Sequence, residues 1–290
     1  MRKFAHIVLG VALLDTSCFA APKQTYLGFD RNNYPGDDAL PALRKSFRYT
    51  SYWLNTPPGE KQNGWVGKRA LLKSQGFGFL VLFNGRLDGQ LKGSDAAAAG
   101  KMDGNAAVMA AKKEGFHPNV LIFLDQEEGG RLLPEQVAYL FSWIDAVESA
   151  GARAGVYCSG IDVPDGSSTI STARDILSRE QTRSKSTSQP ANAKSSSRKR
   201  LALWVANDQC PPSPGCIRTN KPPSNALPSP DLTGSIIWQY AVSPRRSQFS
   251  ASCPKNSDPD GNCYAPGLPH SPDTTLDLNV ANSPNPSEEP

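Results

Sequence analysis

Apolar and polar positions alternate along the chain with two different periods. Short apolar runs, and apolar residues that alternate with polar ones, predict strands, whereas apolar residues three and four apart predict helices. The clearest helix is expected at residues 134–150, because Pro134 suits a first helical turn and Gly151 suits the end. A second helix is expected near residues 102–114. Eight strands are expected, at residues 26–30, 48–54, 78–83, 120–125, 154–158, 201–206, 235–240 and 275–280.

The fold class follows from the order of these elements. Strands that alternate with helices predict a parallel sheet with helices outside it. Eight strands favour a closed α/β barrel of the (β/α)8 or TIM type, in which the chemistry lies at the C-terminal ends of the strands. An open doubly wound sheet is the alternative, although no phosphate-binding glycine loop follows the first strand. The 290 residues suit one large domain, expected over residues 22–280.

The N-terminus has the three-part layout of a secretory signal peptide, expected at residues 1–21. A basic start precedes the apolar run 4–14, and small residues follow it. This run is shorter than the ~20 apolar residues that span a bilayer, and no later run is longer, so we expect no transmembrane segment. Cys18 also allows a lipoprotein signal, which the preceding Asp15 disfavours. The sequence thus predicts a protein that is secreted or periplasmic.

Two segments lack the apolar residues that order a chain. Residues 163–200 are rich in Ser and Thr and hold eight Lys and Arg against three Asp and Glu. We expect a disordered basic insertion there, with binding to anionic surface polymers as the alternative. The tail at residues 281–290 is also expected to be disordered. The net charge of +4 is concentrated in the insertion, so nothing in it indicates a nucleic-acid partner.

Five cysteines follow the signal peptide. Four lie in Pro-rich, loop-like sequence, where an oxidising compartment favours disulfides. The simplest pairing joins Cys210 with Cys216 and Cys253 with Cys263, which would staple this region. Cys158 lies inside a predicted strand and is expected to be a buried small side chain rather than a nucleophile.

Acidic residues follow the strand at residues 120–125. Side chains two apart on a strand share one face, so Asp125 and Glu127 should face the same way, roughly 6.6 Å apart, whereas Glu128 should point away. Repulsion between two such carboxylates raises the pKa of one of them, and the protonated partner can act as a general acid. Taken alone, the pair is also typical of a polar loop or a helix start.

Two further acids strengthen this interpretation. Asp30 closes the first predicted strand, and Asp277 lies in the last one. The first and last strands of a barrel are neighbours, so both acids are expected to converge on one pocket with Asp125 and Glu127.

The same residues belong to five short motifs that carry a resemblance. They are Gly28-Phe29-Asp30, Asp125-Gln126-Glu127, Gly155-Val156-Tyr157, Trp238-Gln239-Tyr240 and Leu276-Asp277-Leu278-Asn279. In this order they resemble the glycoside hydrolase family 25 lysozymes and, more closely, a related family of glycoside hydrolase-like TIM barrels of unknown function. The resemblance covers roughly residues 26–280, apart from the basic insertion.

The resemblance implies a barrel that cuts between the N-acetylated sugars of peptidoglycan. Glu127 matches the catalytic acid of the family, Asp125 its partner carboxylate, and Asp30 and Asp277 its supporting acids. One departure concerns the region after the sixth strand. The lysozymes usually carry an aromatic residue there, whereas this chain reads Trp204-Val205-Ala206-Asn207.

The chemistry of the residues agrees with that implication. Glycoside hydrolysis needs an acid that protonates the leaving oxygen and a group that stabilises the oxocarbenium-like centre. We expect Glu127 to supply the proton, and Asp125 to hold the acetamido group or to stabilise the positive charge. Tyr157, Tyr240 and Gln239 are candidate substrate-binding residues, although aromatic residues in strands more often belong to the core.

Motifs of other enzyme classes are missing from the sequence. The chain after the signal has two histidines, His117 and His270, no His-Glu-x-x-His helix, no Gly-x-Ser-x-Gly turn and no phosphate loop. We expect no cofactor and no metal. The leading hypothesis is a monomeric, exported glycan hydrolase that acts on peptidoglycan or another N-acetylhexosamine polysaccharide. The alternatives are a catalytically inactive glycan-binding barrel of the cell envelope and a purely structural envelope protein.

Overall fold

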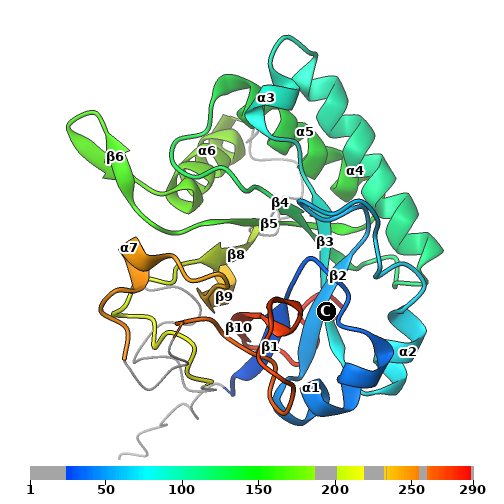
Figure 1. Cartoon of the computed structure of the whole chain (residues 1–290). Coiled ribbons are helices and arrows are strands. Elements are labelled where there is room, and N and C mark those ends of the chain that lie inside the picture. The colour runs from blue at the N-terminus through cyan, green and yellow to red at the C-terminus, as the bar shows by residue number, and fades with distance from the viewer. Residues whose placement is uncertain (1–23, 187–200, 219–231, 233, 255–259, 289–290) are drawn as a thin grey trace, which may run out of the picture.

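A computed structural model describes residues 24–186, 201–218, 232, 234–254 and 260–288 (Figure 1). Within these residues, eight strands close into a barrel in the order β1-β10-β9-β8-β5-β4-β3-β2. The barrel strands are β1 (Tyr26–Asp30), β2 (Tyr49–Trp53), β3 (Gly78–Asn84), β4 (Leu121–Asp125), β5 (Arg153–Ser159), β8 (Ala202–Ala206), β9 (Ser235–Ala241) and β10 (Asp277–Ala281). Each predicted strand is found within two residues of its expected bounds, and the α/β barrel is confirmed.

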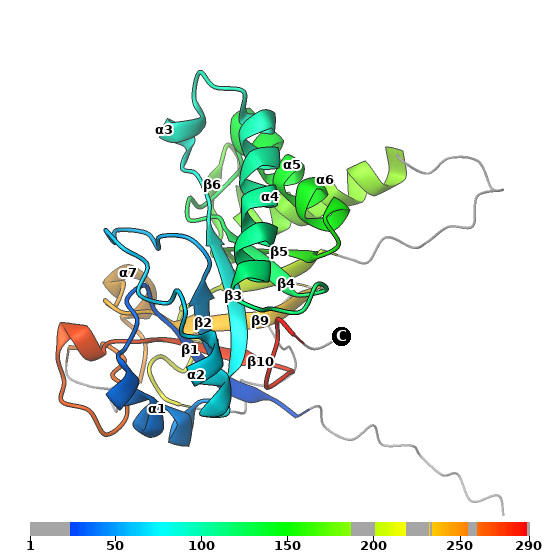
Figure 2. The same ribbon diagram turned by 90° about the vertical axis from the view of Figure 1, so that its right-hand side faces the viewer.

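Helices cover only part of the barrel. Figures 1 and 2 show α4, α5 and α6 grouped on one side, beside β3, β4 and β5, and α1 and α2 near β1 and β2. The side formed by β8, β9 and β10 carries the short α7 and loops instead. No helix in the described residues is long and apolar enough to cross a membrane. The helices are η1 (Asp37–Ala39), α1 (Leu40–Ser46), α2 (Arg69–Ser74), α3 (Asp88–Leu91), α4 (Ala96–Lys113), α5 (Pro134–Ser149), α6 (Thr172–Ser186), α7 (Ser247–Ser250) and η2 (Pro272–Thr274).

The last strand departs from a fully parallel barrel. β10 is antiparallel to both of its neighbours, β1 and β9, whereas the other neighbouring pairs are parallel. A parallel strand needs a crossover that returns the chain to the opposite end of the sheet. The segment after β9 instead stays at one end, and the chain re-enters the sheet in the reverse direction. The first residue of β10, Asp277, therefore lies at the same rim as the last residue of β1, Asp30.

The motif at β1 has a packing reason for its glycine. A Cβ on Gly28 would lie 1.9 Å from Cε2 of Tyr49, on the neighbouring strand β2. Only glycine therefore leaves room for the buried Tyr49 ring inside the barrel. Asp30 is two residues further along β1, so its side chain points into the same interior.

The expected disorder of the basic insertion is wrong for residues 163–186. β6 (Val163–Asp165) and β7 (Ser168–Ile170) form a hairpin, and α6 follows. Composition fails here because arginines of α6 pair with acids and the helix buries an apolar side chain. Arg183 pairs with Asp145 at 2.8 Å and lies over the Phe141 ring, and Ile176 of the same helix is fully buried. The rest of the insertion, 187–200, lies outside the described residues.

The expected disorder of the tail is also wrong for residues 281–288. Ser287 Oγ accepts a hydrogen bond from the Val81 backbone N–H at 2.9 Å, and the Leu121 N–H donates to the Ser287 carbonyl oxygen at 2.8 Å. Arg69 also pairs with Glu288 at 2.5 Å. The tail is ordered by polar groups that satisfy the strand ends of β3 and β4, which counting apolar residues does not detect.

Four cysteines form two disulfides, but the expected pairing is wrong. The bonds join Cys210 with Cys253 and Cys216 with Cys263. Proximity in sequence favoured pairs within each loop, whereas the barrel brings the loop after β8 beside the loop after β9. Cys158 is buried and unpaired, as predicted. Two disulfides are typical of a protein that is exported to an oxidising compartment.

The pairing can be tested by tryptic digestion without reduction. Trypsin leaves Cys210 and Cys216 on one peptide, 201–218, and separates Cys253 from Cys263 by cleavage after Lys255. We expect mass spectrometry to find peptide 201–218 joined to both of the other cysteine peptides. An unlinked peptide 201–218 would contradict the structure.

The same bonds predict a loss of stability. Replacing Cys210 and Cys253 together by Ser should lower the free energy of unfolding by about 4 kcal/mol, because it frees a loop of 43 residues in the unfolded chain. Denaturant unfolding measures the loss. The Cys216–Cys263 bond should persist in this variant, and its scrambling would contradict the assignment.

Candidate active site

One cavity opens at the rim where the parallel strands end. Its volume of about 350 Å³ lies near the lower end of the range for small-molecule sites. It contains all four acids that the sequence singled out, together with three aromatic side chains and one arginine. The lining residues are Asp30, Asn32, Trp53, Leu82, Asp125, Glu127, Tyr157, Trp204, Gln239, Val242, Pro244, Arg246 and Asp277.

Strand register explains why these side chains meet. Asp30, at the end of β1, pairs directly with Asp277, at the start of β10. On the other side of the barrel, Asp125 of β4 is level with Tyr157 of β5, and Tyr157 is level with Trp204 of β8. The cavity is therefore lined by one ring of positions around the barrel mouth.

A hydrogen-bond network centred on Gln239 fixes one pair of acids. The Tyr157 hydroxyl donates to Gln239 Oε1 at 2.7 Å, so the amide nitrogen of Gln239 faces the acids. Gln239 Nε2 donates to Asp30 Oδ1 at 3.0 Å and to Asp277 Oδ2 at 3.5 Å. Asn279 Nδ2 also donates to Asp30 Oδ1, at 2.5 Å.

The second pair, Asp125 and Glu127, has no such support. Asp125 is buried, and neither of its carboxylate oxygens accepts a hydrogen bond from an N–H or O–H donor in the described part of the chain. The neighbouring acid is Glu127, whose charge raises the pKa of Asp125. Glu127 lies beyond the end of β4, exposed at the cavity mouth.

Glu128 lies outside the cavity, as the alternation of side chains predicts. Its Oε2 accepts hydrogen bonds from the Asp88 backbone N–H at 2.7 Å and from Gln136 Nε2 at 2.6 Å. Glu128 thus links the starts of α3 and α5. Its carboxylate is next to Glu127 in the sequence but has a structural role.

The pKa values of all four acids are raised. Loss of contact with water is the main cause in each case. Repulsion by Glu127 raises the pKa of Asp125 further, and repulsion by Asp30 does the same for Asp277. The neighbouring Asp125 side chain and the positive charge of Arg246 act in the opposite direction and partly lower the pKa of Glu127. At least one proton is therefore retained in the cluster above the ordinary range of carboxylic acids.

Three of the lining residues are aromatic, but Tyr240 is not among them. Tyr157 is half-buried, and its ring packs edge-on against Trp204 at 4.8 Å between centroids. Tyr240 follows Gln239 on β9 and therefore faces the opposite way. It is fully buried and packs against Trp238. The structure brings Tyr157 and Gln239 to the cavity and does not bring Tyr240 there.

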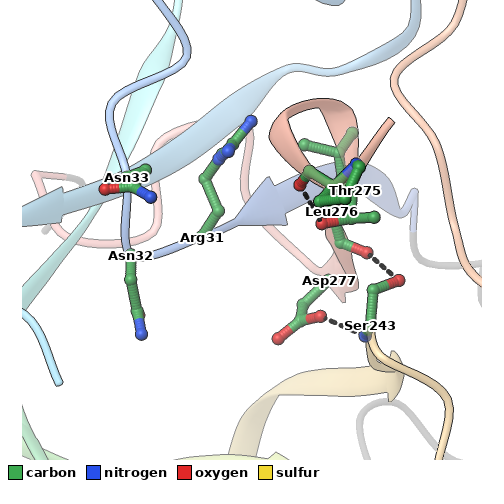
Figure 3. Close-up of a pocket in the computed structure, with 8 residues that line it drawn as sticks. Arg31, Asn32, Asn33, Ser243, Thr275, Leu276 and Asp277 are labelled. Atoms are coloured by element: carbon green, nitrogen blue, oxygen red, sulfur yellow. Dashed lines mark hydrogen bonds between the residues drawn. The ribbon is translucent and has the colours of Figure 1, made fainter. Parts of the chain in front are cut away.

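A polar groove continues from the cavity along the rim. It shares Asn32 and Asp277 with the cavity and has a volume of about 190 Å³. Figure 3 shows Arg31 and Asn32 on one side and Asp277 and Ser243 on the other. The Ser243 backbone N–H donates to Asp277 Oδ1 at 2.6 Å, which orients this carboxylate between the two hollows.

Sequence reasoning missed two polar residues of the site. Asn279 was quoted in a motif without a role, yet it holds Asp30 and accepts a hydrogen bond from Trp204 Nε1 at 2.8 Å. Arg246 follows a Pro-Arg pair in a loop, and nothing in that local sequence indicates that it lines the cavity. Within the described residues, no group of three or more His, Cys, Asp or Glu has an arrangement that could hold a metal ion.

The raised pKa values predict an unusual dependence of stability on pH. Burial raises the pKa of Asp30 from 3.8 to about 6. Between these values the folded chain binds more protons than the unfolded chain, so stability falls as the pH rises from about 4 to about 6. The contribution of Asp30 is up to about 3 kcal/mol.

Thermal unfolding between pH 4 and pH 7 measures this effect. We expect the Tm of the wild-type protein to fall across this range, and the fall to be smaller in Asp30→Asn. The exposed Asp38 offers a control, because Asp38→Asn should keep the wild-type slope. A Tm that rises steadily from pH 4 to pH 7 in all three proteins would refute the prediction.

Comparison with known proteins agrees with this architecture. An uncharacterized protein from B. stearothermophilus is 16% identical, with a TM-score of 0.56 over 88% of this chain and 95% of that chain. The Tat-secreted protein Rv2525c from Mycobacterium tuberculosis is 12% identical, with a TM-score of 0.47 over 91% and 97%. The modular autolysin LytC from Streptococcus pneumoniae is 14% identical, with a TM-score of 0.47 over 90% and 47%.

A comparison of the amino-acid sequence with family models identifies the family of this chain. No curated protein matches the chain. A family model described as an Rv2525c-like, glycoside hydrolase-like domain matches residues 48–211, which is more than half of the chain. The match spans β2 to the loop after β8 and includes Asp125, Glu127 and Tyr157. The chain therefore belongs to the family of Rv2525c-like, glycoside hydrolase-like domains.

Proposed function

We propose that this protein is an exported glycoside hydrolase that cleaves peptidoglycan or another N-acetylhexosamine polysaccharide. The observation that carries the proposal is the pair Asp125 and Glu127, two carboxyls that line one cavity, of which Asp125 has no hydrogen-bond donor among the described residues. Glycoside hydrolysis by general acid catalysis needs such a pair, one member of which keeps a proton near neutral pH. Membership of a glycoside hydrolase-like family supports the same reaction class.

Glu127 is the proposed general acid. It lies at the mouth of the cavity, where it can reach the oxygen between two sugars of a chain that extends out of the site. Its raised pKa favours the protonated form that this role requires, because the ideal pKa of a catalytic acid lies near the working pH. The proton passes from Glu127 to the leaving oxygen as the glycosidic bond breaks.

Asp125 is the proposed partner. It lies deeper than Glu127, and no N–H or O–H donor among the described residues holds its buried carboxylate oxygens. It can accept a hydrogen bond from the substrate acetamido N–H or face the positive charge that develops at the anomeric carbon. Transfer of the Glu127 proton to substrate leaves a negative charge in the pair, which stabilises that positive centre.

Asp30 and Asp277 are proposed to orient the substrate rather than to exchange protons with it. Both are held by Gln239, whose amide is in turn oriented by Tyr157. Groups fixed in this way keep their positions as charge develops, which suits the binding of sugar hydroxyls. Tyr157 borders the same space and offers apolar surface to a sugar ring.

One observation favours a second candidate, a glycan-binding barrel without activity. The lysozymes resembled here usually carry an aromatic residue shortly after the sixth strand. This chain has Asn207, whose carbonyl accepts from Trp238 Nε1, and Asp208, which pairs with Arg246. A cavity that lacks this aromatic platform can still recognise a glycan through its polar groups.

Release of reducing ends from purified peptidoglycan and from chitin oligomers tests the proposal. We expect release by the mature chain and a fall in kcat of roughly 10²–10⁴-fold in Glu127→Gln, because the variant lacks the proton donor. Glu128→Gln is the matched control, since the neighbouring carboxylate lies outside the cavity and Gln preserves its acceptor oxygen. This control should keep wild-type activity.

Two outcomes would contradict the assignment. Equal release by Glu127→Gln and the wild-type protein would remove Glu127 from the reaction. No release by the wild-type protein, with glycan binding retained, would replace the hydrolase by the glycan-binding barrel.

A further inference from the structure

Arg246 introduces a positive charge into a cavity lined by four acids. Among the described residues that line the cavity, it is the only basic one. It lies in the loop after β9, at the residue that precedes α7, and it faces the rim that carries Glu127 and Asp277. The positive charge of Arg246 acts on both acids and works to lower their pKa values.

The Arg246 guanidinium is held by an acidic side chain and an aromatic ring. Arg246 Nε donates to Asp208 Oδ2 at 3.2 Å, and Nη2 donates to Asp208 Oδ1. The Asp208 side chain is only 4% exposed, whereas that of Arg246 is 37% exposed. The Phe249 ring lies 4.9 Å from the guanidinium carbon. A buried acid and a ring therefore fix the orientation of an arginine that is still accessible.

The covalent frame of the loop adds to this fixation. The Cys210–Cys253 disulfide joins the segment next to Asp208 to the segment that follows α7. The Cys210 backbone N–H also donates to the Phe249 carbonyl oxygen at 3.2 Å. Arg246 and Asp208 thus belong to two loops that are tied together, and the cation cannot withdraw from the cavity without disturbing both.

Three of the five N–H donors of this guanidinium remain for a ligand. A guanidinium has five N–H groups, and Asp208 takes one from Nε and one from Nη2. No acceptor among the described residues takes the two N–H groups of Nη1. An arginine that is held by one carboxylate on one edge can bind a second carboxylate on the other edge.

We propose that Arg246 is a specificity-determining residue that binds a carboxylate substituent of the sugar in the cavity. The inference rests on the proposed function and narrows its substrate class. It favours an N-acetylhexosamine that carries a free carboxylate, as the lactyl ether of muramic acid does in glycan strands without stem peptides, over neutral polymers such as chitin. The four acids would repel such a carboxylate from the other parts of the cavity lining. This repulsion would fix the orientation of the sugar ring.

Binding of two matched tetrasaccharides tests the proposal without turnover. One alternates N-acetylglucosamine with N-acetylmuramic acid, and the other is chitotetraose of the same length. Titration calorimetry with the Glu127→Gln protein should give about tenfold or more tighter binding of the acidic tetrasaccharide. In Glu127→Gln with Arg246→Gln, the two affinities should become equal.

Controls separate charge, geometry and folding. Arg174→Gln removes an exposed arginine that pairs with Asp162 and does not line the cavity, and it should keep the tenfold ratio. Arg246→Lys keeps the charge but lacks the planar fork, and it should keep part of the ratio. Circular dichroism and the unfolding midpoint identify any variant that fails to fold, in which case the lysine variant decides.

Equal affinities in the protein that retains Arg246, or an unchanged ratio in both Arg246 variants, would overturn the proposal. Its failure is distinguishable from that of the hydrolase. If the wild-type protein releases no reducing ends but the ratio depends on Arg246, the recognition of a carboxylate stands and the enzymatic activity does not. If release occurs with equal kcat/KM on both tetrasaccharides, the hydrolase stands and the role of Arg246 does not.

Discussion

β10 runs antiparallel to β1, and the first residue of β10, Asp277, pairs in register with the last residue of β1, Asp30. This pairing closes the barrel, since β10 is the only strand between β1 and β9 in the described sheet order. It also fixes two acids from opposite ends of the sequence side by side at one rim. Burial of both carboxyls costs free energy, and the amide of Gln239 offsets part of that cost by donating to each.

The consequence is a cavity with two unlike pairs of acids. Asp30 and Asp277 have donors that hold them in one position, whereas no donor among the described residues holds the Asp125 carboxylate beside Glu127. An anchored acid keeps its orientation, and neighbouring carboxyls that repel each other retain a proton above the ordinary range of carboxylic acids. The division suits a site in which one pair orients a ligand and the other transfers a proton.

The part of the cavity lining that carries Arg246 is formed by loops rather than by strands. Among the described residues no long helix covers the barrel beside β8 to β10, and two disulfides tie the loop after β8 to the loop after β9. Asp208 lies in the first loop and Arg246 in the second, so their ion pair sits within this covalent frame. The cavity thus combines an acidic wall carried by strands with a single cation carried by stapled loops.

The sequence by itself determined the strands, the barrel, and the placement of Asp125 and Glu127 on one face, because these follow from periods of two and from residues near in sequence. Only the tertiary structure decided the direction of β10, the pairing of Cys210 with Cys253, the burial of Tyr240 and the position of Arg246. Each of these depends on contacts between segments far apart in the chain. No local pattern of apolar and polar residues records such contacts.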